Sequence, residues 1–254
     1  ELADDFNLQE ALEWGLLPKS VKLGSKKLKA EFLQSYTRTY LKEEIWAEQI
    51  IKNLEPFRYF LEVAAQMNGK IINFDKLSKD VGVDDKTIKN YFSILSDTML
   101  GFTLNGFKSS FRKRLSTKPK FYFFDTGVKR ALDDSLDVKL KPSTSAYGEA
   151  FEHFIILEIM KLCNYNHRNY KFSYLKTKDD AEVDLIVERP GKKALFIEIK
   201  SSISVNSDSL SNLAKLSEDY GNCEAICLSQ DSQSRKTGNI KILPWQLGLK
   251  QYFS

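Results

Sequence analysis

The sequence predicts an α/β fold, α+β over its whole length, in which a helical N-terminal part precedes a domain built on a mixed β-sheet. Apolar residues recur at helical spacing through most of the first hundred residues. The C-terminal part alternates helix-like and strand-like segments in the order αβββαβ. The chain has 254 residues, of which 42% are hydrophobic and 28% charged, so its composition is that of a globular protein with a sizeable core.

Residues 1–54 are predicted to form a helical segment. Apolar and aromatic side chains recur at helical spacing over residues 6–17 and 28–53, with charged side chains between them. We expect Trp14 and Trp46 to lie in the core.

Residues 55–140 are predicted to form a winged helix. Three helical patterns are separated by turns at Gly69 and Gly82, and two strand-like segments, GFTLNGF and KFYFFD, follow them. Asp84 or Asp85 can cap the third helix. The apolar stripe expected to face inward on that helix is Ile88, Phe92 and Leu95.

Basic side chains in this region predict contacts with DNA phosphates. Residues 108–120 carry six Lys or Arg and no acidic residue, and we expect them in or beside the wing. The predicted DNA-binding residues are Lys86, Lys89, Arg112, Lys113, Arg114 and Lys118. A solvated loop would show the same charges, and winged helices also act as protein-contact modules, so a scaffolding role stays open.

Residues 141–254 are predicted to form the αβββαβ domain, with one further strand and one further helix at its end. The first helix covers YGEAFEHFIILEIMKLC, and a strand, NYKFSYLKT, precedes a hairpin that turns at Pro190-Gly191. A helix with Ser207 as its expected cap then crosses over to the strand CEAICLS. A helical crossover favours a mixed sheet.

The hairpin AEVDLIVERPGKKALFIEIKSS places two carboxylates opposite each other. With Gly191 at its centre, the pairs on one face are Asp184 with Glu198, Glu182 with Lys200 and Ile186 with Phe196. Strict alternation places Val183 on the other face, which is apolar and packs on a core. Opposed carboxylates repel unless a divalent cation neutralises them, and the alternative is a set of solvated charges on an exposed face.

The cysteines and the hydropathy pattern exclude several classes of protein. Cys163, Cys223 and Cys227 include no CxxC pair, and with two histidines in the chain a structural zinc site is not expected. Cys223 and Cys227 lie in a strand pattern and are expected in the core. No long apolar run or signal-like N-terminus is present, so we expect a cytoplasmic protein without a membrane partner. Because the chain begins with Glu1, we expect a fragment or a processed chain.

These segments resemble two known groups of proteins. The αβββαβ order, with Asp184 on the second strand and Glu198-Ile199-Lys200 on the third, resembles the core of the PD-(D/E)XK nuclease superfamily. The segments LEWGLLP, YLKEEI, KPKFYFFDTGV, YGEAFEHF, AEVDLIVE and FIEIKSS run in the order found in the C-terminal part of a family of bacterial and archaeal AAA-type ATPases. This resemblance covers essentially the whole chain. The sequence has no GxxxxGK[ST] motif, so the resemblance implies that ATP binds to an N-terminal ATPase domain that this chain lacks.

The resemblance also implies the site residues. The expected catalytic residues are Asp184, Glu198, Lys200 and Glu152, and the expected ligands of Mg²⁺ or Mn²⁺ are Glu152, Asp184 and Glu198. Glu149, on a neighbouring part of the same helix surface, is a second candidate for the helix carboxylate, and Val183 stands where the superfamily has proline. Hard oxygen ligands hold such a cation, which lowers the pKa of a bound water and neutralises charge on the attacked phosphate. Lys200 would orient that water or stabilise the oxyanion.

Two functions follow, and the sequence leaves both open. In the first, a metal-dependent deoxyribonuclease domain is delivered to DNA by the winged helix and driven by the ATPase. In the second, a catalytically inactive module binds DNA or protein and regulates the ATPase, with Glu182, Asp184 and Lys200 in a salt-bridge network. The ATPase resemblance leaves a homo-oligomer open for the intact protein.

Overall fold

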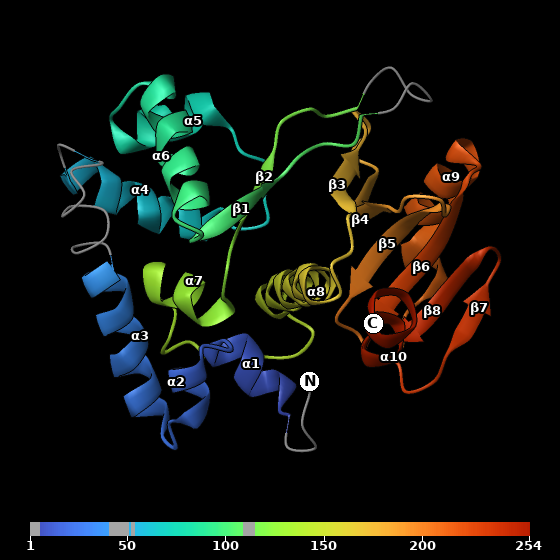
Figure 1. The fold of residues 1–254 in the computed structure, drawn as a ribbon, viewed down its shortest axis with the longest axis horizontal. Coiled ribbons are helices and arrows are strands. Elements are labelled where there is room, and N and C mark those ends of the chain that lie inside the picture. The colour runs from blue at the N-terminus through green and yellow to red at the C-terminus, as the bar shows by residue number, and fades with distance from the viewer. Residues whose placement is uncertain (1–5, 41–50, 52–53, 109–114) are drawn as a thin grey trace. The chain divides into compact units, whose positions relative to one another are not determined.

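The computed structural model describes residues 6–40, 51, 54–108 and 115–254, and it divides the chain into two compact units (Figure 1). Unit 1 is built from Glu1–Thr103 and Lys120–Leu140, and unit 2 from Leu104–Pro119 and Lys141–Ser254. The fold is mixed α+β, as predicted. Residues 104–119, which were predicted to belong to the winged helix of residues 55–140, belong in the structure to unit 2.

Unit 1 begins with three helices, α1 (Leu8–Trp14), α2 (Pro18–Lys22) and α3 (Lys26–Tyr40). The side chain of Asn7 caps α1, and Gly15, with φ of 70°, follows its last residue. Pro18 occupies the first position of α2, where its missing N–H costs nothing. Trp14 is buried, as predicted. Residues 41–50, which include Trp46, and residues 52–53 lie outside the described residues.

The three helices and two strands of the middle region follow the predicted order. They are α4 (Leu54–Gln66), α5 (Phe74–Val81) and α6 (Asp85–Asp97), followed by a two-stranded sheet of β1 (Gly101–Leu104) and β2 (Lys120–Phe123). Asp84 caps α6, because its side chain accepts a hydrogen bond from the Thr87 amide. The stripe that was expected to face inward, Ile88, Phe92 and Leu95, is buried. Ile71 forms an antiparallel bridge with Lys120 and so adds to the ribbon.

Helix α7 (Thr126–Leu132), which was not predicted, packs on α1. Asp125 caps α7 and also accepts a hydrogen bond from the Leu16 amide at 2.7 Å. A Cβ atom on Gly127 would lie 2.4 Å from the Trp14 carbonyl oxygen, so only glycine fits at this contact. The segments LEWGLLP and KFYFFDTGV therefore hold each other in place.

Unit 2 contains a six-stranded mixed sheet in the order β3-β4-β5-β6-β8-β7. Its elements are α8 (Ser145–Tyr165), β3 (Lys171–Lys176), β4 (Glu182–Glu188), β5 (Ala194–Lys200), η2 (Ser207–Leu210), α9 (Ser211–Tyr220), β6 (Cys223–Ser229), β7 (Arg235–Thr237), β8 (Ile240–Pro244) and α10 (Trp245–Phe253). Strands β3, β4 and β5 are antiparallel, whereas β5, β6 and β8 are parallel. The αβββαβ element order and the mixed sheet are thus as predicted, and β7 is additional. Asn206, not Ser207, caps the helical segment after β5.

Helices cover both faces of this sheet (Figure 1). Helix α9 contributes Leu213 and Leu216 to the hydrophobic cluster that contains Phe196 and Cys227. Helix α10 packs on the opposite face, where Gly248 lies against Leu228, the neighbour of Cys227 in β6. Helix α8 contacts both α10 and β5. Of the helices that the structure describes, none combines the length and the apolar character needed to cross a membrane.

We predict that Asp125→Ala lowers the free energy of unfolding by about 3 kcal/mol, because the partly buried amide of Leu16 and the buried amide of Val128 both lose a charged acceptor. The measurement is urea-induced unfolding followed by circular dichroism. Asp80→Ala, which removes an exposed carboxylate on α5, is the matched control and should change the free energy by less than about 0.5 kcal/mol. Equal effects of the two substitutions would contradict the role given to Asp125.

Candidate functional site

The hairpin of β4 and β5 has the predicted register near its turn. The paired residues are Leu185 with Ile197, Ile186 with Phe196 and Val187 with Leu195. Gly191 has φ of 72°, a conformation that glycine adopts without strain. The prediction of a Gly191-centred register is therefore confirmed for this part of the hairpin.

Strand β4 contains a β-bulge at Asp184 and Leu185. On the β3 side, the pairs on either side of the bulge are Ser173 with Ile186 and Leu175 with Val183. An advance of two residues along β3 thus corresponds to an advance of three residues along β4. The extra residue breaks the alternation of side chains along β4. Val183 packs in the same hydrophobic cluster as Ile186 and Phe196. The prediction that Val183 lies on the opposite face from Ile186 is wrong for this reason.

The bulge ends the pairing of β4 with β5. If the register of the hairpin continued, Ile199 would pair with Val183. The pairing of β4 with β5 instead ends at Leu185 and Ile197. The Ile199 amide instead donates to Oδ2 of Asp184 at 2.7 Å. Asp184 and Glu198 are therefore not a regular cross-strand pair, and the carboxylate of Asp184 takes the place of a main-chain acceptor.

Glu198 is a buried carboxylate with one charged partner. Its Oε1 lies 2.7 Å from Nζ of Lys200, and only 8% of the residue is exposed. Burial raises the pKa of Glu198, Lys200 opposes the shift, and the charges of Glu152 and Glu182 add to it, so the pKa lies above its ordinary range. Oε2 of Glu198 is buried and has no hydrogen-bond partner among the described residues.

Lys200 stays protonated in this setting. Burial acts to lower the pKa of Lys200, but the charge and hydrogen bond of Glu198, followed by the charge of Asp184, raise it above its ordinary value. Glu182, which was predicted to face Lys200, forms its ion pair with Lys176 instead, at 3.1 Å. The bulge explains this change of partner, since the β4 register is shifted where Glu182 lies.

The structure brings the four predicted catalytic residues into one neighbourhood. The charges of Glu198 and Asp184 both raise the pKa of Lys200, and the charge of Glu152 raises the pKa of Glu198. Glu152 is half-buried on α8, whereas Glu149 is exposed. Glu152 is therefore the better candidate for the helix carboxylate.

Several residues that support this site were not predicted. Cys227, buried as expected, pairs with Glu198 in the parallel register of β5 and β6, and burial raises the pKa of its thiol far above its ordinary range. Nε2 of Gln230 donates to the Ser201 carbonyl at 2.6 Å and to the Tyr147 hydroxyl at 3.3 Å, which ties the end of β5 to the start of α8. No local signal reveals these contacts, because the pairing of β5 with β6 is not encoded in either strand alone.

The predicted metal ligands do not form a three-ligand cage. Among the described residues, no three His, Cys, Asp or Glu side chains are grouped so that they could hold a metal ion. Mg²⁺ does not require three protein ligands, because it keeps several waters and binds through one or two carboxylates plus substrate phosphates. The buried, unpartnered Oε2 of Glu198 fits such a ligand, since a cation would satisfy it.

The predicted DNA-binding residues are distributed over both units. Lys86 and Lys89 lie on the exposed side of α6, with Nζ of Lys89 5.4 Å from the centre of the Phe74 ring. Lys118 is exposed and belongs to unit 2. Arg112, Lys113 and Arg114 lie outside the described residues.

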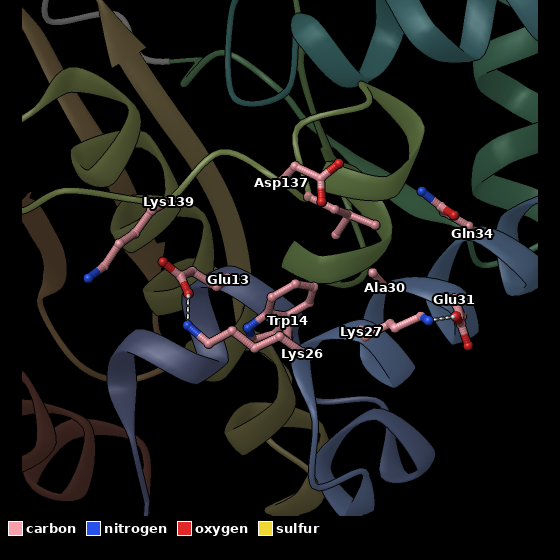
Figure 2. Close-up of a pocket in the computed structure, with 10 residues that line it drawn as sticks. Glu13, Trp14, Lys26, Lys27, Ala30, Glu31, Gln34, Asp137 and Lys139 are labelled. Carbon is pink, nitrogen blue, oxygen red and sulfur yellow. Dashed lines mark ion pairs between the residues drawn. The ribbon is translucent and has the colours of Figure 1, made fainter.

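Unit 1 also contains a pocket of about 480 Å³ between α1, α3 and the segment after α7. Figure 2 shows the side chains that line it, among them Trp14 and two ion pairs, Lys26 with Glu13 at 3.8 Å and Lys27 with Glu31 at 3.9 Å. The pocket therefore presents paired charges instead of a basic surface. None of the predicted catalytic or DNA-binding residues that the structure describes lines it.

We predict that Glu198→Gln leaves the protein as stable as the parent, or more stable, at neutral pH. A raised pKa means that folding favours the protonated form, so the parent loses stability as the pH rises from the usual value of 4.5 through the higher pKa of the folded state. Glutamine cannot ionise, and the advantage of the variant should therefore grow over that window. The measurement is urea-induced unfolding at a series of pH values, with Glu188→Gln, an exposed site on β4, as the control.

A Glu198→Gln variant that is less stable than the parent at neutral pH and has the same pH dependence would contradict this account. It would show that the attraction to Lys200 outweighs the cost of burying the charge.

Comparisons with known proteins place the chain in a family without an assigned function. Residues 5–141 match the family model described as "Domain of unknown function (DUF8612)", and residues 147–247 match "Domain of unknown function (DUF4143)". Two curated relatives are uncharacterized protein Mb2031c of Mycobacterium bovis and uncharacterized protein Rv2008c of Mycobacterium tuberculosis, each 27% identical over 189 residues, which make up 73% of this chain. The match covers 41% of each relative, so the chain spans about two fifths of the length of the curated relatives it matches. Because the first model covers more than half of the chain, the protein belongs to the family described as "Domain of unknown function (DUF8612)".

Proposed function

We propose that this chain is the C-terminal part of an AAA-type ATPase, in which a DNA-binding winged helix is joined to a nuclease-like domain that hydrolyses DNA phosphodiesters with Mg²⁺ or Mn²⁺. The convergence of Asp184, Glu198 and Lys200 at the bulged end of the hairpin, with Glu152 beside them, carries the proposal. Acidic, acidic and lysine side chains in this order on adjacent strands are the set that the PD-(D/E)XK resemblance implies.

The chemistry of these side chains suits metal-assisted hydrolysis. A bound cation would lower the pKa of a water ligand and neutralise charge on the phosphate. Glu198 and Asp184 would hold the cation, and Lys200, which stays protonated, would stabilise charge on the phosphate oxygens. The burial of Glu198 strengthens each of these interactions, because the effective dielectric constant is lower than in water.

The DNA-binding part of the proposal rests on the element order of unit 1. Helix α4, the bridge at Ile71, helices α5 and α6 and the ribbon of β1 and β2 follow one another as they do in winged helices. Lys86 and Lys89 lie on the exposed side of α6, the second helix of the helix-turn-helix pair. The length of the relatives, which exceeds the matched part by more than a factor of two, agrees with an additional ATPase domain in the intact protein.

A second candidate function is a catalytically inactive module that binds DNA or protein and regulates the ATPase. The ion pair of Glu198 with Lys200 and the hydrogen bond of Asp184 with Ile199 favour it, because both give the carboxylates a structural role. The lack of a three-ligand group among the described side chains favours it as well.

We predict that the chain cleaves plasmid and branched DNA in millimolar Mg²⁺ or Mn²⁺, and that Glu198→Ala abolishes cleavage because a metal ligand is lost. Glu188→Ala, which removes an exposed carboxylate from the same hairpin, should cleave like the parent. The measurement is gel analysis of cleavage with and without a chelator. If the parent shows no metal-dependent cleavage, the regulatory module is the better description.

The effect of Mn²⁺ on the melting temperature distinguishes a variant that has lost a metal ligand from a variant that has lost stability. Mn²⁺ should raise the melting temperature of the parent by mass action on the folded state. Asp184→Asn keeps an oxygen that can accept from Ile199, so its apo stability should stay close to that of the parent while the Mn²⁺ response disappears. A destabilised variant combined with a parent that does not respond to Mn²⁺ would contradict the nuclease proposal.

We predict that the affinity for DNA falls steeply with salt and that Lys86→Ala combined with Lys89→Ala flattens the log–log salt dependence by roughly 2 units, one for each lost phosphate contact. Fluorescence anisotropy with a labelled random-sequence duplex measures this slope. Lys79→Ala combined with Lys76→Ala removes the same charge from exposed positions on α5 and serves as the control. An unchanged slope in the α6 variant would favour a protein-contact role for the helix-turn-helix.

A further inference from the structure

Two limbs, Leu104–Lys108 and Leu115–Pro119, together called the arm, belong to unit 2 and pair with the outer edge of its sheet at β3 (Figure 1). On one limb, the Phe107 amide donates to the Tyr174 carbonyl at 2.7 Å, and the Tyr174 amide donates to the Asn105 carbonyl at 3.0 Å. On the other limb, the Ser116 amide donates to the Lys176 carbonyl at 2.8 Å. Both limbs thus satisfy main-chain groups of β3 that would otherwise form an open sheet edge.

Side chains anchor the arm in the core of unit 2. Phe107 is 4% exposed, and its ring centre lies 6.1 Å from that of Phe196 and 5.7 Å from that of Tyr220, both in edge-on contacts. A Cβ atom on Gly106 would lie 2.1 Å from the Ser116 carbonyl oxygen, so the two limbs touch each other. The buried Tyr174 hydroxyl donates to the Lys118 carbonyl. These contacts fix the described limbs of the arm on unit 2 before any partner binds.

The arm joins the sheet at the end that carries the candidate site. Leu115 forms a bridge with Thr177, directly after β3, and Lys176 pairs with Glu182 at the start of β4. Glu182 is two residues from Asp184, whose carboxylate marks the point where β4 and β5 separate. The second limb and the site are therefore close neighbours along the β3–β4 pair.

The charged side chains of the two limbs are all basic. The limbs hold Lys108 and Lys118 and no acidic residue. Lys108 and Lys118 are exposed and form no ion pair with any residue that the structure describes. Exposed, unpaired lysines on a pre-ordered backbone suit a phosphate backbone, because little conformational entropy is lost on binding. Residues 109–114 lie outside the described residues.

We propose that the arm binds the phosphate backbone of duplex DNA and holds it at the Asp184–Lys200 end of the sheet, as part of the nuclease-like unit and not as the wing of the helix-turn-helix. The inference rests on the proposed DNA-binding function and adds to it the surface that presents DNA to the candidate site. Lys108 and Lys118 are thus positioning residues, which act on the substrate backbone and take no part in bond cleavage.

The test compares two double variants that remove equal charge, Lys108→Ala with Lys118→Ala on the arm and Lys86→Ala with Lys89→Ala on α6. Binding of a fluorescein-labelled random-sequence duplex is measured over a range of salt concentrations, and amide hydrogen exchange is measured with and without the duplex. We expect the arm variant to flatten the log–log salt dependence by roughly 2 units. We also expect DNA to slow exchange at the Phe107 and Ser116 amides in the parent and in the α6 variant, but not in the arm variant.

Cleavage assays separate failure of this inference from failure of the proposed nuclease. If the duplex protects the arm amides but no metal-dependent cleavage occurs, the arm inference stands and the nuclease proposal fails. If cleavage occurs and the arm variant matches the parent in salt slope, in exchange and in KM, the arm inference is overturned while the nuclease proposal stands. A parent that binds no duplex overturns the arm inference directly.

Discussion

The hydrogen bond from the Ile199 amide to the Asp184 carboxylate is the interaction on which the candidate site depends. A continuous β4–β5 ladder would use that amide for a main-chain carbonyl, and the side chains of Asp184 and Glu198 would stand as an ordinary cross-strand pair. The bulge instead lets a side chain replace the main chain as acceptor. The two strands separate at the residues that carry the charges, as is common where bulges occur near functional sites.

The burial of Glu198 sets the electrostatics of this opening. An ion pair with Lys200 at 2.7 Å does not fully offset the cost of removing a carboxylate from water, and the charges of Glu152 and Glu182 add to that cost. A protein optimised for stability alone would not leave Oε2 buried without a partner. The arrangement becomes understandable if a positive group, such as a cation, completes the site during function.

Features that depend on residues close together in the sequence were predicted, whereas the pairing of segments far apart in the sequence could not be. The Asp84 cap, the buried stripe of Ile88, Phe92 and Leu95 and the hairpin register near Gly191 each depend on residues close together in the chain. The bulge could not be predicted, because polar and apolar residues alternate from Glu182 to Leu185 and the extra residue is visible only against β3. Helix α7 was missed because it is short and starts directly after a strand. The same limit applied to the candidate site: the hairpin pattern and the resemblance pointed to Asp184, Glu198 and Lys200 as candidates, but not to the ion pair of Glu182 with Lys176.

The arm has a consequence for the way in which the chain can be divided. Unit 2 obtains the outer edge of its sheet, and one aromatic ring of its core, from residues that precede the last segment of unit 1. A cut near residue 140, between the two matched family regions, would leave Phe107 without its core and β3 without its neighbour. The arm therefore belongs to the first family region by sequence and to unit 2 by structure. During synthesis the arm emerges before the strands that receive it, so the sheet of unit 2 can be completed only by contacts of long sequence separation.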